Sequence, residues 1–435
     1  MGPEQSDPVA KGRWFFQVAL VTAPLSFIFV GGHVLFTPHA LHHTYGGDFV
    51  DFWVGARLLL QGRVFEMFDP MAFRHALLAL APPGSPPSSL PYPPSYYPLI
   101  AWIGLFPLGI ALELWSLLGV AALLTACWPF SRNPWVAGAV LVSPAVAFSL
   151  DLGQNGLFTA ALIIGGLRQV DRRPWLAGVL LGLATFKPQL GLLIPVALVA
   201  AGRWRVIGWA AASAATLAAV GTLLTGAQAW AYFLTRTLPF QRDLIATGYG
   251  QGPAMTPSLL VAAHSSGLSL QGAWIFQALA SLLCAIAVFL WFGRLRAQRR
   301  GIAGVDILLL VTAGMVAAPY AFAYDMPATV LALVLACEQR PELDTRAAWR
   351  WGGFLLWEAP IFMFIVGVLP WPGGVAWYGS GAIMLTGALI LIGVALRQGR
   401  RFSAPDAGAD SAFNLFPRLT SAVPKPSGHQ AADSA

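Results

Sequence analysis

Long apolar segments, separated by short polar loops, run through most of this chain. A helix needs about 20 apolar residues to cross a bilayer, and the first segment, from Trp14 to Phe36, is long enough. Of all residues 57% are hydrophobic and 10% are charged, whereas soluble domains carry about 25% charged residues. The sequence therefore predicts an all-α, polytopic integral membrane protein and excludes a soluble enzyme.

We expect about twelve membrane-crossing segments, several of them shorter than a full span. After Trp14 to Phe36, the apolar segments are 96–129, 135–148, 156–168, 175–186, 188–201, 205–225, 272–293, 305–320, 325–337, 350–370 and 376–396. The stretch 96–129 counts as one crossing plus a piece that dips into the membrane, because Pro107 interrupts it. The short segments need a protein-lined or water-filled cavity beside them.

Most clusters of basic residues fall on one side of this predicted topology, and the other side carries few cations. The clusters are Lys11 with Arg13, Arg132, and the loops 168–173, 202–205, 294–300 and 397–401. Cytoplasmic loops carry the excess of Lys and Arg, so we predict that this side is cytoplasmic, and we attribute the net charge of +7 to topology and not to nucleic-acid binding. The first segment lacks a signal-peptide cleavage site and is interpreted as an anchor. The predicted organisation is a cytoplasmic N-terminus (1–13), a transmembrane domain (14–397) and a disordered cytoplasmic tail (398–435).

The stretch GGDFVDFWVGARLLLQG, residues 46–62, opens the first external loop. Asp48 with Asp51 three residues later is typical of a helix N-cap with an acidic partner, so we expect an amphipathic helix on the membrane surface. A helix held in this way would keep the Asp48 carboxylate at the membrane boundary, where it could accept a proton from a hydroxyl group. Capping and catalysis both remain open for Asp48.

A proline-dense stretch, residues 82–98, follows in the same loop. Proline interrupts helices, so we expect an extended strap on the external side. Its tyrosines, Tyr92, Tyr96 and Tyr97, suit a membrane interface.

Polar residues also interrupt the apolar pattern at DLGQNG (151–156), FKPQ (186–189) and PYAFAYD (319–325). The first reads as a simple turn or as a ligand site, because the amide of Gln154 can bind a hydroxyl or a phosphate oxygen. Lys187 could reach out to the interface or bind a phosphate, since ionisable groups at membrane depth are usually functional. Asp325 could simply cap a helix. All of these motifs fall on the predicted external side, which favours a single site there.

The motifs GGDFVDFWVGARLLLQG, YPPSYYPLI, DLGQNGLFTAALIIGGL, GLATFKPQLGLLIPVAL and APYAFAYDMP, in this order, resemble glycosyltransferase family 87 over roughly residues 14–395. This family belongs to the GT-C superfamily of membrane glycosyltransferases that use polyprenyl-phosphate sugars. Many of its members carry a histidine near the last motif, and YAFAYD has none.

The resemblance implies transfer of a hexose, with mannose the favoured sugar, from a polyprenyl-phosphate donor to a hydroxyl of a lipid or glycan. The reaction would be inverting, on the external face of the bacterial plasma membrane, without a metal or cofactor. Asp48 maps to the general base. The family's residues that bind the donor phosphate and sugar map to Lys187, Gln189, Gln154, Asn155, Tyr324 and Asp325. Asp51 and Arg57 would support them.

Other functional classes share the apolar composition. A transporter or a lipid or glycan flippase also has about a dozen helices, but would be expected to place its ionisable residues at the membrane midplane and to show an internal repeat. A non-catalytic membrane scaffold would leave the one-sided polar motifs unexplained. The one-sided placement favours the transferase.

Overall fold

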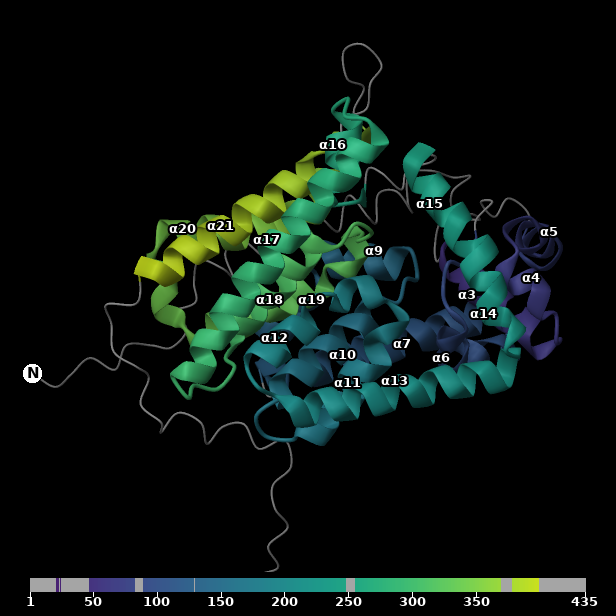
Figure 1. Cartoon of the computed structure of the whole chain (residues 1–435), viewed down its shortest axis with the longest axis horizontal. Coiled ribbons are helices and arrows are strands. Elements are labelled where there is room, and N and C mark those ends of the chain that lie inside the picture. Colours follow the sequence, from purple (N-terminus) through teal and green to yellow (C-terminus); the bar gives the residue numbers. More distant parts are fainter. Residues whose placement is uncertain are drawn as a thin grey trace, which may run out of the picture. The chain divides into compact units, whose positions relative to one another are not determined.

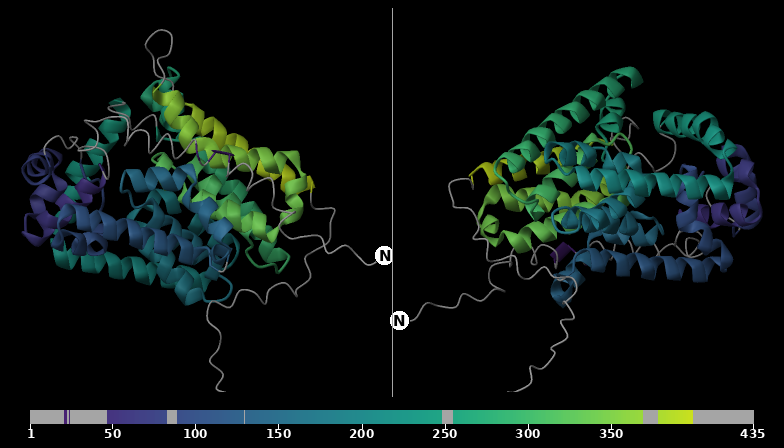
Figure 2. Two further views of the ribbon diagram at one scale, coloured as in Figure 1. Left: turned by 180° about the vertical axis from the view of Figure 1, so that it is seen from behind. Right: turned by 60° about the horizontal axis from the view of Figure 1, so that its bottom comes forward.

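The computed structural model describes residues 21–22, 24, 47–82, 89–128, 130–247, 255–368 and 378–398. Within these ranges the regular elements are helices and no strand occurs, which confirms the all-α prediction. Figures 1 and 2 show how the helices pack. The predicted N-terminus 1–13, most of the segment Trp14 to Phe36 and the tail beyond Gln398 lie outside the described residues.

The first part of the described chain surrounds an aromatic core. Its elements are α3 (Phe49–Leu60), α4 (Val64–Phe68), α5 (Pro70–Leu80), the 3-10 turn η2 (Pro94–Tyr96), α6 (Tyr97–Ile100), the 3-10 turn η3 (Ala101–Leu105) and α7 (Leu108–Ala126). The Phe52 ring lies 5.6 Å from that of Tyr96 and 5.8 Å from that of Trp115, so this core joins α3 to η2 and α7.

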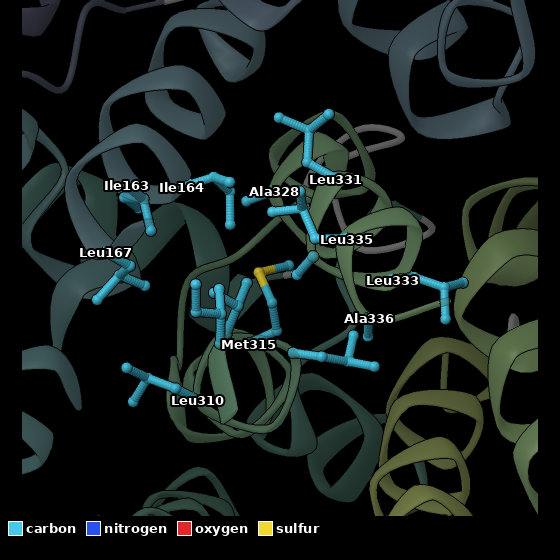
Figure 3. Packing of buried hydrophobic residues seen from close by; sticks show 14 of the residues in the cluster. Ile163, Ile164, Leu167, Leu310, Met315, Ala328, Leu331, Leu333, Leu335 and Ala336 are labelled. Carbon is cyan, nitrogen blue, oxygen red and sulfur yellow. The ribbon is translucent and has the colours of Figure 1, made fainter. Parts of the chain in front are cut away.

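A second core joins most of the remaining helices, which are α8 (Pro134–Leu141), α9 (Pro144–Asp151), α10 (Gly156–Gln169), α11 (Pro174–Leu183), α12 (Ile194–Ala200), α13 (Trp204–Thr225), α17 (Leu270–Ala297), α18 (Gly304–Ala317), α19 (Pro327–Gln339), α20 (Ala347–Val368) and α21 (Ser380–Gln398). Helix α16 (Leu259–Ser265) packs its buried residues against the start of α17 in a small separate cluster. Ile164, Met315 and Leu331 belong to α10, α18 and α19 and pack together in the interior (Figure 3). Helices α18 and α19 are buried along most of their length, as expected for helices that are apolar on every side.

The segment 226–270, predicted as a long external loop, contains helices. They are α14 (Gln228–Tyr232), the π-helical turn η7 (Phe233–Thr237) and α15 (Leu238–Thr247), followed by α16. The Arg236 guanidinium lies 2.6 Å from the Asp69 carboxylate, and the Thr237 hydroxyl donates to the Phe68 carbonyl at 2.7 Å. These contacts fasten η7 to α4 and to the start of α5.

The structure supports fewer full-length spans than the sequence predicted. Four described helices are long and apolar enough to cross a membrane, or up to five if the bent pair α8 and α9 forms one span. The other described apolar helices include shorter ones such as Gly156–Gln169 and Gly304–Ala317, so the prediction of several short helices is confirmed. The count of about twelve crossings is not confirmed, because short helices inside a protein core cannot be assigned as crossings by length.

One prediction for the external loop is not confirmed and another needs correction. Helix α3 is present but buried over most of its surface, with Phe49 and Phe52 packed against Trp115, so its predicted place on the membrane surface is not confirmed. The proline-dense strap becomes helical from Pro94 onwards, because proline is tolerated in the first turn of a helix. Its part 83–88 lies outside the described residues.

Glycines allow α11 and α13 to pack closely. A Cβ atom on Gly178 would lie 2.3 Å from the Trp209 Cβ and 2.7 Å from the Val206 carbonyl oxygen. A Cβ atom on Gly182 would lie 2.5 Å from the Ala210 carbonyl oxygen. Small residues bring helix backbones together in the same way in other membrane proteins.

We therefore predict that Gly178→Ala destabilises the protein by about 1–3 kcal/mol, the usual result of overpacking. The matched control is Gly208→Ala on α13, where a Cβ would meet no atom within 4 Å. That control should be neutral or stabilising, because alanine favours helix more than glycine does. Thermal unfolding in detergent measures both effects, and equal stability of the two variants would contradict the packing argument.

Candidate functional site

The turn between α9 and α10 lies against the start of α3. The Phe49 amide donates to the Leu152 carbonyl at 3.2 Å, and the Gln154 side-chain amide donates to the Asp48 carboxylate at 2.8 Å. Gly153 gives the turn its shape through a φ of +65°, a value that glycine adopts without strain. Residues that are far apart in the sequence therefore meet at the Asp48 carboxylate.

Asp48 does not cap α3 with its side chain. It has φ −78° and ψ −21°, and its carboxylate makes no capping hydrogen bond. The predicted capping geometry is therefore wrong, and the carboxylate instead accepts the bond from Gln154. Burial raises the pKa of Asp48, while the Gln154 hydrogen bond and the charge of Lys187 act in the opposite direction.

Lys187 and Asp325 form a buried ion pair, with 2.6 Å between the Lys187 Nζ and Asp325 Oδ1 atoms. The exposed fractions of the two side chains are 3% and 1%, so Lys187 does not reach out to the interface. Lys187 stands between the 3-10 turns η5 (Ala184–Phe186) and η6 (Pro188–Gly191), and Asp325 ends the 3-10 turn η9 (Ala323–Asp325). Asp325 also accepts a bond from the Phe322 amide at 3.2 Å, so it caps this turn as well.

Aromatic rings surround the ammonium group of Lys187. Its Nζ lies 5.8 Å from the centre of the Tyr92 ring and 5.2 Å from that of Tyr324. The Asn155 side-chain amide donates to both the Tyr92 hydroxyl, at 3.0 Å, and the Tyr96 hydroxyl, at 2.9 Å. The two tyrosine rings stack with 4.1 Å between their centres. A cation beside aromatic faces is stabilised by their electrostatic field.

We call these residues the polar cluster: Asp48, Tyr92, Tyr96, Gln154, Asn155, Lys187, Tyr324 and Asp325. A close backbone contact joins its parts, since a Cβ on Gly156 would lie 1.8 Å from the Tyr324 carbonyl oxygen. No larger residue fits there, so Gly156 sets the approach of α10 to η9.

Two acceptors in the polar cluster have no partner. The Gln154 Oε1 and Asn155 Oδ1 atoms are buried and make no hydrogen bond within the described part of the chain. A buried acceptor without a partner is costly, and such an atom is suited to a hydrogen-bond donor of a ligand.

The sequence had not singled out Tyr92 and Tyr96 as site residues. We predicted both of them, with Tyr97, at a membrane interface, yet all three are buried. A buried tyrosine usually finds a hydrogen-bond partner for its hydroxyl group. That tendency is the feature of the sequence that could have indicated their contact with a polar residue of the site.

Other predicted site residues lie differently. Asp51 is buried and not directed to the interface. The pKa of Tyr92 is raised by burial first, and then by the charges of Asp325, Asp48 and Asp51. Arg57 stands in the last turn of α3, where it donates to the Phe106 carbonyl at 3.4 Å and lies 4.9 Å from the centre of the Trp53 ring. Gln189 is half-buried and makes no hydrogen bond to the polar cluster among the described residues. The structure thus leaves Arg57 outside the polar cluster.

The polar cluster combines a proton-accepting carboxylate, a buried cation and unpartnered acceptors. Among the residues that the structure describes, no group of three or more His, Cys, Asp or Glu side chains could hold a metal ion. The absence of a metal requirement remains a prediction.

The model of glycosyltransferase family 87 matches residues 90–319, more than half of the chain. This range includes Gln154, Asn155 and Lys187, and it ends before Asp325. No curated protein and no solved structure matches the chain. The family match decides between the functional classes that the apolar composition left open, a transferase, a transporter and a scaffold. The chain belongs to glycosyltransferase family 87, and it is a membrane glycosyltransferase.

Proposed function

We propose that the protein transfers a hexose, with mannose the favoured sugar, from a polyprenyl-phosphate donor to a hydroxyl of a lipid or glycan. Asp48 acts as the general base, and the reaction inverts the anomeric centre. The observation that carries the proposal is the polar cluster, in which the Asp48 carboxylate accepts a bond from Gln154, and the neighbouring Asn155 holds the Tyr92 ring beside the Lys187 ammonium group.

The environment of Asp48 suits proton abstraction. Burial raises its pKa, and a carboxylate with a raised pKa is a stronger base once it is ionised. Gln154 occupies one lone-pair direction of Oδ2 and orients the carboxyl group, and Asp48 itself is only half-buried. An acceptor hydroxyl can therefore donate its proton to the remaining lone pairs.

Lys187 suits the phosphate of the donor. An ammonium group offers three N–H donors, and Asp325 is its one hydrogen-bond partner within the described ranges. The leaving phosphate gains negative charge as the glycosidic bond breaks, and a preorganised cation stabilises that charge. Tyr324, beside Lys187, and Gln189, two residues further along, would complete this side of the site.

The arrangement favours inversion. Inversion needs a single base on the acceptor side, while the phosphate leaves on the opposite side. Retaining glycosidases, by contrast, need a second carboxylate as the nucleophile. The unpartnered Gln154 Oε1 and Asn155 Oδ1 atoms would accept hydrogen bonds from sugar hydroxyls.

We also propose that the polar cluster faces the outside of a bacterial plasma membrane. Asn155 precedes α10, whereas Arg168 stands in its last turn, and a helix of this length is about 20 Å long. The loops rich in arginine therefore lie at the end of α10 away from the polar cluster, and an excess of arginine is typical of the cytoplasmic side.

For Asp48→Asn we expect normal folding and donor binding, but a turnover rate lower by about 10²–10⁴. The side-chain oxygen of the introduced asparagine can still accept the Gln154 bond, yet an amide cannot take up the proton. The matched control is Asp69→Asn, another aspartate at a helix start in the same loop, which caps α5 and pairs with Arg236 away from the polar cluster. Turnover of polyprenyl-phosphate-mannose by Asp48→Asn at the wild-type rate would reject the role as base.

Lys187→Met should abolish turnover and also reduce stability by about 3–5 kcal/mol, because it leaves Asp325 buried and unpaired. The double variant Lys187→Met/Asp325→Asn should recover most of the stability, because it leaves no unpaired charge. The side-chain oxygen of the introduced asparagine can still accept the hydrogen bond from the Phe322 amide. The double variant should not recover activity. If it recovered both, the lysine would serve the fold alone and would have no role at the phosphate. Lys187→Arg, which keeps the charge, should keep part of the turnover.

The orientation is tested by cysteine labelling of intact cells. Ser266→Cys, at an exposed position after α16, should react with a membrane-impermeant maleimide, and Gln298→Cys, exposed after α17, should not. The native Cys127 and Cys284 are buried, and the half-buried Cys337 is replaced by alanine in the protein used for labelling. Labelling at position 298 from outside would reverse the orientation.

A further inference from the structure

Three segments that carry arginines contact one another where helices α11 and α13 begin and α17 ends. We call residues 168–173, 202–205 and 294–303 the arginine junction. The Asp171 carboxylate pairs with the Arg203 guanidinium at 2.5 Å and accepts a bond from the Ile302 amide at 2.7 Å. One carboxylate thus holds two of the turns against the third.

Arg296 packs directly on the second turn. A Cβ atom on Gly202 would lie 3.1 Å from the Arg296 Nε atom, so the guanidinium group lies over this glycine. Gly202 has a φ of +69°, a conformation in which a side chain would be strained and would also crowd Arg296. The close contact of Arg296 with this turn therefore depends on glycine at position 202.

The arginine junction has an excess of positive charge. Arg205, Arg294, Arg296 and Arg299 are exposed, and none of them has an ion-pair partner within the described ranges. The nearby carboxylates are already engaged, Asp171 by Arg203 and Asp306 by Arg300. The structure thus leaves several guanidinium groups free to bind anions.

The backbone at Arg299 gives a separate indication. Its φ of +53° is the one positive value at a non-glycine residue in the described part of the chain. The Arg300 amide donates to the Leu295 carbonyl at 2.9 Å, which is the helix ending that normally has glycine at this position. An arginine in a conformation that suits glycine points to a use for its side chain, because strained residues concentrate at functional sites.

Tryptophans locate the arginine junction at the membrane surface. Trp175 and Trp204 begin α11 and α13 and are 53% and 60% exposed. Exposed tryptophans at helix ends are typical of the level of the lipid headgroups. Helices α13 and α17, which carry Arg205, Arg294 and Arg296 at their ends, are both long and apolar enough to span a membrane.

We propose that the arginine junction is a binding site for the phosphate headgroup of an anionic glycerophospholipid. Guanidinium groups bind phosphate through paired hydrogen bonds, and clusters of basic residues next to a membrane span recognise anionic lipids. The site is separate from the polar cluster and requires no part of the proposed transfer reaction.

The wild-type protein provides the first test. The full-length protein is reconstituted into nanodiscs of phosphatidylcholine, alone or mixed with phosphatidylglycerol, and the lipid that it retains on extraction is measured by native mass spectrometry. We expect retained phosphatidylglycerol and a higher unfolding temperature in the mixed nanodiscs. Equal retention of both lipids would overturn the proposal, and so would an equal rise in unfolding temperature when inorganic phosphate is added to nanodiscs of phosphatidylcholine alone.

Variants locate the site. Arg294→Gln/Arg296→Gln should weaken phosphatidylglycerol retention by roughly 25-fold, the product of a roughly fivefold loss for each arginine near an anionic surface. Arg294→Lys/Arg296→Lys should lose only part, because lysine keeps the charge without the paired geometry. The matched control, Arg74→Gln/Arg242→Gln, removes exposed arginines of α5 and α15 and should retain the lipid as the wild type does. An equal loss in the control would show that net charge alone holds the lipid.

Discussion

The buried ion pair of Lys187 and Asp325 constrains the rest of the site. A charge taken out of water is stable only beside a partner, and removing one member of such a pair is strongly destabilising. The break between α11 and α12 must therefore meet the turn before α19, although the residues are 138 positions apart in the chain. Tyr92 and Tyr324 close around the ammonium group, and Asn155 holds Tyr92.

Short helices follow from this arrangement. Polar turns stand at both ends of α10 and of α11. Within a membrane, the backbone N–H and C=O groups of such turns need hydrogen-bond partners from the protein itself. The polar cluster supplies them at one end of α10, and the arginine junction supplies charged contacts at the other. The same helix thus separates the proposed catalytic site from the proposed lipid-binding site.

Local and long-range interactions compete at Asp48. The pattern of Asp48 and Asp51 fits a capped helix, and capping needs only neighbouring backbone groups. In the folded protein the carboxylate accepts a bond from Gln154 instead, 106 residues away. A burial-raised pKa at that carboxylate, beside a lysine, is the kind of perturbation that marks functional sites.

The sequence by itself determined the membrane class, the helical architecture, the break at Pro107 and the polar motifs that meet in the site, because composition and periodicity report on burial in lipid and on helix formation. It also singled out Asp48, Gln154, Asn155, Lys187 and Asp325, since polar groups in an apolar chain require an explanation. Only the tertiary structure decided that Asp48 is not a side-chain cap, that α3 and Tyr92 are buried, that Arg57 lies elsewhere and that the arginine loops touch. Such outcomes depend on contacts between distant segments, and local patterns carry no information on which partner a buried polar group finds.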